Sequence, residues 1–195
     1  KDYVRPGAID VNIMTKLDRT NYDKDKNPLP DQYSDAVAAL RGFANSKIDA
    51  GIVFSAGFNR RLFAHCDKVE DFYFRNNAFK KRIILKVSDY RSSLIQGRFL
   101  AKKGVWVSEY RIESGLNCGG HAFATEGLLC GPILQEFKDN KHMLDDECRA
   151  ICNEVLTKNE KPRLPEWLES NVTYQGGIGT SQEQDFLMNY YNVSA

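Results

Sequence analysis

The segment from Glu113 to His121 holds residue types that could do chemistry. It reads Glu-Ser-Gly-Leu-Asn-Cys-Gly-Gly-His and follows Val105-Trp106-Val107, a run of β-branched and aromatic residues that indicates a buried strand. Glycine has no Cβ, so the backbone at Gly119 and Gly120 could come close to a flat or anionic ligand. An imidazole exchanges protons near neutral pH, which makes His121 a candidate general acid or base. The alternative is a loop histidine that only bonds locally.

A second glycine-rich element lies downstream, at Gly176-Gly177-Ile178-Gly179-Thr180. It falls between an expected strand and an expected helix, so its backbone N–H groups and the helix dipole could hold a phosphate. The alternative is a tight turn into the last helix. No Gly-Lys-Ser/Thr follows, which excludes a Walker motif, and Gln182 stands where a Rossmann fingerprint needs its third glycine.

Lys86 is a cation inside an apolar strand, and this needs a reason. It could face a phosphate or a developing negative charge, or it could extend outward past the end of its strand. Asn12, residues 55–57 and Glu109 also lie at or near strand ends. Ligands of parallel α/β folds bind beyond the carboxyl ends of strands, so these positions are candidates too.

The cysteines give weaker signals. Cys118 and His121 could form a nucleophile and base, but two close neighbours in one glycine loop have poor geometry for that. Cys148 and Cys152 fall one turn apart on an expected helix, with His142 six residues before Cys148. That spacing could be half a zinc site, although one helical face packed in a core is the simpler interpretation.

Strand-like and helix-like segments alternate along the chain. The expected strands are 9–15, 49–55, 81–87, 105–110 and 171–174. The expected helices are 35–46, 89–103, 133–138, 145–157 and 182–191, with caps at Ser34, at Ser88 or Asp89, and at Thr180 or Ser181. Residues 16–32 form an expected loop, and 59–77 follow no clear pattern. Alternation predicts βαβ units and a parallel sheet.

Two α/β architectures fit this order, a doubly wound sheet and part of a (β/α)₈ TIM barrel. A whole barrel needs about 250 residues, and this chain has 195. The chain begins without Met and stops just after an amphipathic segment. We therefore expect residues 1–195 to form a single partial (β/α)₈ domain, with about five of eight units and truncation at both ends. Exposed sheet edges favour pairing between copies, so a homo-oligomer stays open.

Composition excludes several classes of protein. The net charge is +1, so there is no electrostatic case for nucleic acid or an anionic membrane. No apolar run approaches the roughly 20 residues of a membrane helix. Five irregularly spaced cysteines indicate reduced thiols in a cytoplasmic protein. The basic run Lys80–Arg82 predicts a solvated strand edge, and Phe72, Tyr73 and Phe74 are expected in the core.

The order of these motifs resembles a known enzyme family. The chain has Val11-Asn12-Ile13, then Phe54-Ser55-Ala56-Gly57, then Ile84-Leu85-Lys86-Val87, then a glutamate followed by Gly-Gly-His, and then Gly-Gly-Ile. This resembles the FMN-dependent (β/α)₈ nitronate monooxygenases (2-nitropropane dioxygenases) and the related flavin enoyl-acyl-carrier-protein reductases. The likeness covers most of the chain in order, although only the two glycine motifs are specific.

The resemblance implies FMN as cofactor and a small-molecule substrate. His121 would be the catalytic histidine, acting as acid or base beside the flavin. The cofactor-binding residues would be Asn12, Lys86, Glu113, Gly119, Gly120, Gly176 and Gly177, with the choice between Glu109 and Glu113 left open. The chain departs from the family in the longer lead into Gly-Gly-His and in two long connections, 18–30 and 60–77. The alternatives are a phosphate-ligand isomerase or lyase that uses Lys86, and a non-catalytic ligand-binding barrel.

Overall fold

The computed structural model describes residues 9–15, 18–55, 57–113 and 130–195. Five strands form one all-parallel sheet in chain order, β1-β2-β3-β4-β5. The strands are β1 (Val11–Met14), β2 (Ala50–Ser55), β3 (Lys81–Val87), β4 (Val107–Glu113) and β5 (Asn171–Gln175). The helices are α1 (Asp35–Asn45), α2 (Arg60–Phe63), α3 (Tyr90–Ala101), α4 (Cys130–Lys158) and α5 (Ser181–Tyr191), with 3₁₀ turns at Asp31–Tyr33, Cys66–Lys68 and Glu70–Phe72.

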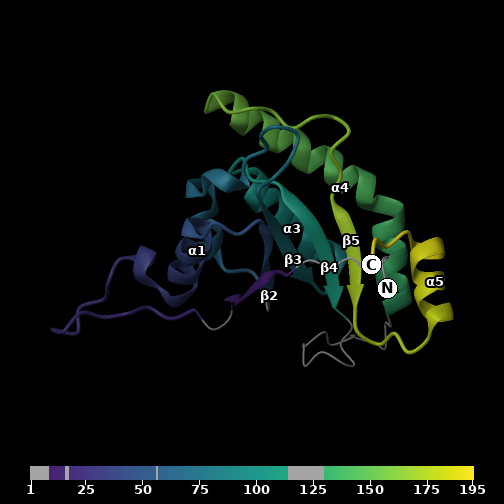
Figure 1. Ribbon diagram of the computed structural model, residues 1–195, viewed down its shortest axis with the longest axis horizontal. Coiled ribbons are helices and arrows are strands. Elements are labelled where there is room, and N and C mark those ends of the chain that lie inside the picture. The colour runs from purple at the N-terminus through teal and green to yellow at the C-terminus, as the bar shows by residue number, and fades with distance from the viewer. Residues whose placement is uncertain (1–8, 16–17, 56, 114–129) are drawn as a thin grey trace.

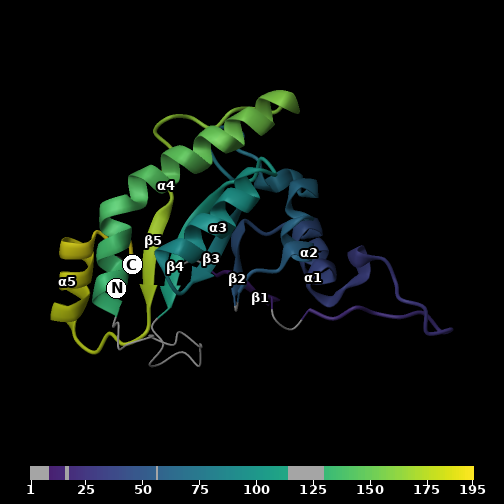
Figure 2. The ribbon, with the colours of Figure 1, turned by 180° about the vertical axis from the view of Figure 1, so that it is seen from behind.

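The strand order confirms the predicted parallel α/β sheet. A doubly wound sheet reverses its strand order part-way, and these five strands show no reversal. Sequential pairing of parallel strands is compatible with a (β/α)₈-type repeat. Figures 1 and 2 show the strands at the centre, with α1 to one side and α4 and α5 to the other. Among the described residues, no helix has the length and apolarity that crossing a membrane demands.

The two faces of the sheet differ in chemistry. On one face Ile13, Phe54 and Leu85 belong to a single hydrophobic cluster with residues of α1, α3 and α4. Side chains alternate between faces along a strand, so Asn12 and Lys86 point to the opposite side. We call that side the polar face. One face of the sheet is therefore buried against helices, and the other carries charged side chains.

A register shift between β3 and β4 decides which residues of β4 reach the polar face. Ile83 pairs with Val107 but Ile84 pairs with Glu109, so Ser108 is an extra residue between two pairs. Such a bulge reverses the facing of every later side chain. Tyr110 consequently packs in the core, and Glu109, Arg111 and Glu113 lie on the polar face. The strand predicted at 105–110 starts two residues later and extends to Glu113.

Most predicted helices are confirmed, but the division of α4 and the Ser34 cap are wrong. The two helices expected at 133–138 and 145–157 are one continuous helix, α4. The residues between them, 139–144, begin with four polar residues but include neither glycine nor proline, so nothing there breaks a helix. Asp89 and Thr180 cap α3 and α5 as expected. The Ser34 side chain makes no cap hydrogen bond to α1.

The basic run Lys80–Arg82 is not uniformly a solvated edge. The Lys81 side chain is 0% exposed, whereas that of Lys80 is 54% exposed. The Lys81 ammonium donates hydrogen bonds to Ala44 O, Ser46 O and Asp71 Oδ2, each at 2.8 Å. Three acceptors offset the cost of burying this cation, and they tie β3 to the end of α1. The aromatics Phe72, Tyr73 and Phe74 are buried, as predicted.

The backbone after α5 runs beside β5. Asn192 ends α5 in the left-handed conformation, with φ 58°. Ser194 N then donates to Val172 O at 2.7 Å, and Tyr174 N donates to Ala195 O at 3.0 Å. The strand–helix alternation thus brings the chain back to the sheet after β5, as it does after each earlier helix.

Candidate functional site

The carboxyl ends of β3 and β4 carry an ion pair on the polar face. Lys86 Nζ lies 2.7 Å from Glu113 Oε1, and the two side chains are 13% and 14% exposed. Lys86 comes from the penultimate position of β3, and Glu113 ends β4. Because all strands are parallel, these two ends meet at one edge of the sheet. The structure therefore brings two predicted site residues into contact, and Lys86 does not extend outward into solvent.

Asn12 lies on the polar face at the other side of the sheet. Its Oδ1 atom accepts a hydrogen bond from Ser55 Oγ at 2.8 Å. Ser55 also lies 3.0 Å from the sulfur of Met14. The hydroxyl of Thr15 then donates to the carbonyls of Ser55 and Gly57, each at 2.5 Å. These contacts join the ends of β1 and β2 and fix the orientation of the Asn12 amide.

A second charged group lies deeper on the polar face, around Arg111. Its Nε donates to Glu109 Oε1 at 2.7 Å, and Thr173 Oγ1 donates to the same oxygen at 2.6 Å. Its Nη2 lies 3.5 Å from Asp10 Oδ2. Both glutamates of β4 thus face the polar side, with Glu113 nearer the carboxyl edge. Sequence reasoning missed Arg111, because nothing in the sequence signals the register shift at Ser108. It missed Asp10 and Thr173 because only their contacts with Arg111 and Glu109 single them out.

The contact between Arg111 and Asp10 also reports the curvature of the sheet. Arg111 belongs to β4, and Asp10 immediately precedes β1, three strands away. Three strand spacings of about 4.8 Å would separate these backbones by about 14 Å in a flat sheet, before any offset along the strands. An ion pair at 3.5 Å indicates that the sheet curves toward its polar face.

Gly51 leaves room on the polar face for the side chains of Ile84 and Asp10. A Cβ at this position would lie 2.5 Å from Ile84 Cδ1 and 2.7 Å from Asp10 Oδ1. The Gly51 backbone N–H also donates to Asp10 Oδ1 at 3.0 Å. A side chain here would displace the ends of the Ile84 and Asp10 side chains, and the Gly51 N–H helps to hold Asp10 toward Arg111.

The two glycines that follow β5 both have positive φ angles. Gly176 and Gly177 have φ of 95° and 75°, a region that glycine adopts without steric cost. The start of α5 is different, because Glu183 Oε2 accepts from Gly179 N at 2.7 Å and from Thr180 N at 2.9 Å. These hydrogen bonds lower the pKa of the Glu183 carboxyl. The Glu183 carboxylate thus accepts from two backbone N–H groups that the sequence analysis proposed for a phosphate.

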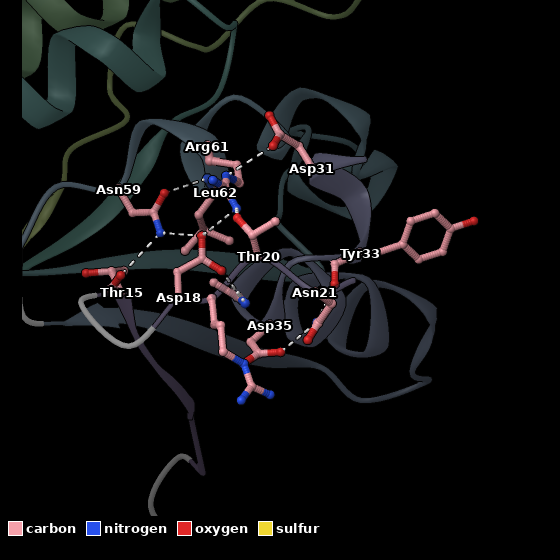
Figure 3. A network of polar contacts seen from close by, with 12 residues as sticks. Thr15, Asp18, Thr20, Asn21, Asp31, Tyr33, Asp35, Asn59, Arg61 and Leu62 are labelled. Carbon is pink, nitrogen blue, oxygen red and sulfur yellow. Dashed lines mark hydrogen bonds and ion pairs between the residues drawn. The ribbon is translucent and has the colours of Figure 1, made fainter. Parts of the chain in front are cut away.

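A network of polar contacts fastens the connection after β1 to the start of α2 (Figure 3). Asp18 Oδ1 accepts from Ala36 N at 3.0 Å, so this carboxylate, and not Ser34, serves the first turn of α1. Asn59 Nδ2 donates to Asp18 Oδ2 at 3.0 Å and to Thr15 O at 3.2 Å. Burial raises the pKa of Asp18, but the hydrogen bonds from Asn59 and Ala36 outweigh it, and the net shift is downward.

Several sequence predictions lie outside the described residues. These are His121, Gly119, Gly120 and Cys118. Within the described part of the chain, no group of three His, Cys, Asp or Glu side chains could hold a metal ion. Cys148 and Cys152 are free thiols buried in the core, as the simpler interpretation predicted.

Comparison of the chain with protein-family models, with curated proteins and with solved structures gives no match. The case for a function consequently rests on the residues themselves.

Proposed function

We propose that the chain forms part of an FMN-dependent oxidoreductase of the nitronate monooxygenase type, built on a (β/α)₈ barrel. The ion pair between Lys86 and Glu113 at the carboxyl edge of the polar face is the observation that carries the proposal. A charged pair placed there, beside strand ends that bear Asn12 and the glycine pair, suits a polar cofactor with one flat ring and one anionic end.

The described residues fit such a cofactor in part. Gly176 and Gly177 offer a backbone without Cβ atoms for close approach. Lys86 and the oriented amide of Asn12 offer polar contacts to the rim of a ring. The N–H groups of Gly179 and Thr180 do not fit a phosphate while Glu183 holds them. The phosphate would therefore be held at Gly176 and Gly177, or it would displace Glu183.

Bound FMN would supply electron or hydride transfer, and the protein would supply binding, orientation and proton transfer. In this proposal His121 removes or delivers a proton at a carbon next to an electron-withdrawing group. Glu113 holds the Lys86 ammonium in place, and Ser55 holds Asn12. An isomerase or lyase that forms an imine at Lys86 is the second candidate, and it would have to break the contact between Lys86 and Glu113.

Absorbance spectroscopy of the purified protein tests the cofactor assignment. Bands at about 370 and about 450 nm, before or after addition of FMN, are expected for a flavoprotein. Lys86→Gln should weaken FMN binding about tenfold, the effect of one lost hydrogen bond to a charged group. Arg82→Gln is the matched control, because Arg82 lies on the same face at the opposite end of β3 and pairs with the exposed Asp49. A colourless protein that takes up no FMN would refute the proposal.

The acid–base assignment has its own test. His121→Ala should leave FMN binding unchanged and lower turnover of a nitronate or an enoyl thioester by about 10²- to 10⁴-fold. Equal turnover in wild type and variant would remove His121 from the mechanism. An imine trapped at Lys86 by borohydride would instead favour the lyase.

A further inference from the structure

The connection between β1 and α1 projects away from the rest of the molecule (Figures 1 and 2). Its outer part, residues 21–29, is a small hairpin that we call the arm. Tyr22 and Pro28 form an antiparallel bridge. Asp23 N donates to Asn27 O at 2.9 Å, and Leu29 N donates to Asn21 O at 2.8 Å. A connection of this length is uncommon unless it has a function, and the hairpin gives it a defined surface.

The base of the arm is fixed to the body of the protein. Asn21 Nδ2 donates to Tyr33 O at 2.7 Å and to Asp35 Oδ1 at 2.9 Å. Arg61 of α2 contacts Thr20 Oγ1 at 3.1 Å and Asp31 Oδ1 at 3.3 Å. Ordering an exposed segment costs conformational entropy, and these contacts offset that cost at the base. The arm is thereby held in one direction, with its tip in solvent.

The tip carries Asp23-Lys24-Asp25-Lys26, all exposed. The Asp23 carboxylate closes the turn, since its Oδ1 accepts from Asp25 N and Asn27 N, both at 2.9 Å. Lys24, Asp25 and Lys26 have no ion-pair partner among the described residues. Beside them Tyr22 is 61% exposed. The tip thus offers unpaired charges of both signs next to an aromatic ring, with Lys24 and Asp25 adjacent in the turn.

We propose that the arm is the contact between two copies of this chain, paired antiparallel about a two-fold axis. Such a contact uses the same surface on both subunits, so the surface must be complementary to itself. Antiparallel pairing centred between Lys24 and Asp25 sets each Lys24 opposite the Asp25 of the other copy. A tip with equal numbers of Asp and Lys residues gives no attraction to a polyanion such as nucleic acid or an acidic membrane.

A charge-swap experiment on the full chain tests this pairing. Lys24→Asp places two acidic side chains opposite each other in a homodimer, and Asp25→Lys places two basic ones. Each variant alone should dimerise at least about tenfold more weakly than wild type, because like charges at a contact are strongly unfavourable. An equimolar mixture of the two variants should recover the wild-type association, because each chain then meets the opposite charge.

Sedimentation velocity at increasing protein concentration, up to about 1 mM, measures the association. Lys47→Asp is the control, because Lys47 is exposed on a loop away from the arm and undergoes the same change of charge. Both arm substitutions lie at an exposed hairpin tip, and unchanged thermal unfolding would verify that the variants fold. A wild-type chain that stays monomeric overturns the proposal. A dimer that neither swap weakens, or that the mixture does not restore, overturns it as well.

Discussion

Two lysines of β3, Lys81 and Lys86, lie in opposite environments. Lys81 begins the strand on the helix-facing side, is fully buried and donates to three oxygen atoms. Lys86 lies near the carboxyl end on the polar face, is partly exposed and pairs with Glu113. The first cation joins elements of the fold, and the second lies where ligands of parallel α/β proteins bind. Both residues are lysines of the same strand, so their different roles follow from the face and the end of β3 on which each lies.

Substituting Lys81 should have the largest effect on stability. Lys81→Met leaves the carbonyls of Ala44 and Ser46 and the carboxylate of Asp71 without their buried donor. We expect the free energy of unfolding to fall by about 4 kcal/mol, because two backbone carbonyls lose a charged donor and Asp71 loses one of its two lysines. Urea denaturation measures it. Lys80→Met is the matched control, since Lys80 also pairs with Asp71 but is 54% exposed; its effect should stay below about 1 kcal/mol. Equal effects in the two variants would contradict the structural role of Lys81.

The sequence predicted the sheet better than it predicted the polar face. The strand at Lys81–Val87 has the predicted bounds because its apolar centre is unmistakable. The facing of Glu109, Arg111 and Glu113 depends on one extra residue, Ser108, which no local pattern indicates. In a regular ladder Ser108 would pair with Ile84 and Glu109 with Leu85, and the same charges would point into the helix-facing core. Alternation predicts the face of a side chain only while the ladder is regular, and here it is not.

The buried lysine illustrates the same limit. A run of three basic residues looks like a solvated edge in sequence, because the acceptors that make burial of Lys81 tolerable come from distant parts of the chain. Ala44 and Ser46 lie 37 and 35 residues away. By contrast, the starts of α3 and α5 follow from local caps, Asp89 and Thr180, and each was one of the two cap residues predicted from the sequence.

Glycine substitutions on the two sides of the molecule should have opposite signs. Gly51→Ala on the polar face would push a methyl group against Ile84 and Asp10, and should destabilise the protein by about 2 kcal/mol. Gly42 lies in α1, and a Cβ there would meet nothing beyond its own helix within 4 Å. Gly42→Ala should therefore stabilise the protein by about 0.5–1 kcal/mol through helix propensity. Thermal and urea unfolding report both. A tolerated Gly51→Ala would mean that the sheet can open away from Asp10.

Lys86→Met should cost less stability than the same change at Lys81. Among the described residues Lys86 donates to the Glu113 carboxylate alone, whereas Lys81 also donates to two carbonyl oxygens. We expect a loss of about 2 kcal/mol, between the values for an exposed and a buried ion pair, alongside the tenfold weaker FMN binding proposed for Lys86→Gln. The ratio of the two methionine variants sharpens the comparison of the two lysines. A loss at Lys86 as large as that at Lys81 would assign Lys86 a mainly structural role.

The smallest effect on stability is expected from substitution of Asp18, which contacts Ala36 of α1 and Asn59 before α2. Its pKa is lowered in the folded state, so its charged form stabilises the protein above the unfolded-state value of about 3.9 and that contribution is lost as pH falls below it. Asp18→Asn removes this titration but keeps an oxygen that can accept from Ala36 N. The variant should be somewhat less stable at neutral pH, and its stability should fall less between about pH 5 and pH 3. Urea unfolding across that range measures the difference. Parallel pH profiles for wild type and variant would show that the contacts with Asn59 and Ala36 do not favour the carboxylate. The network would then not stabilise the fold through the charge of Asp18.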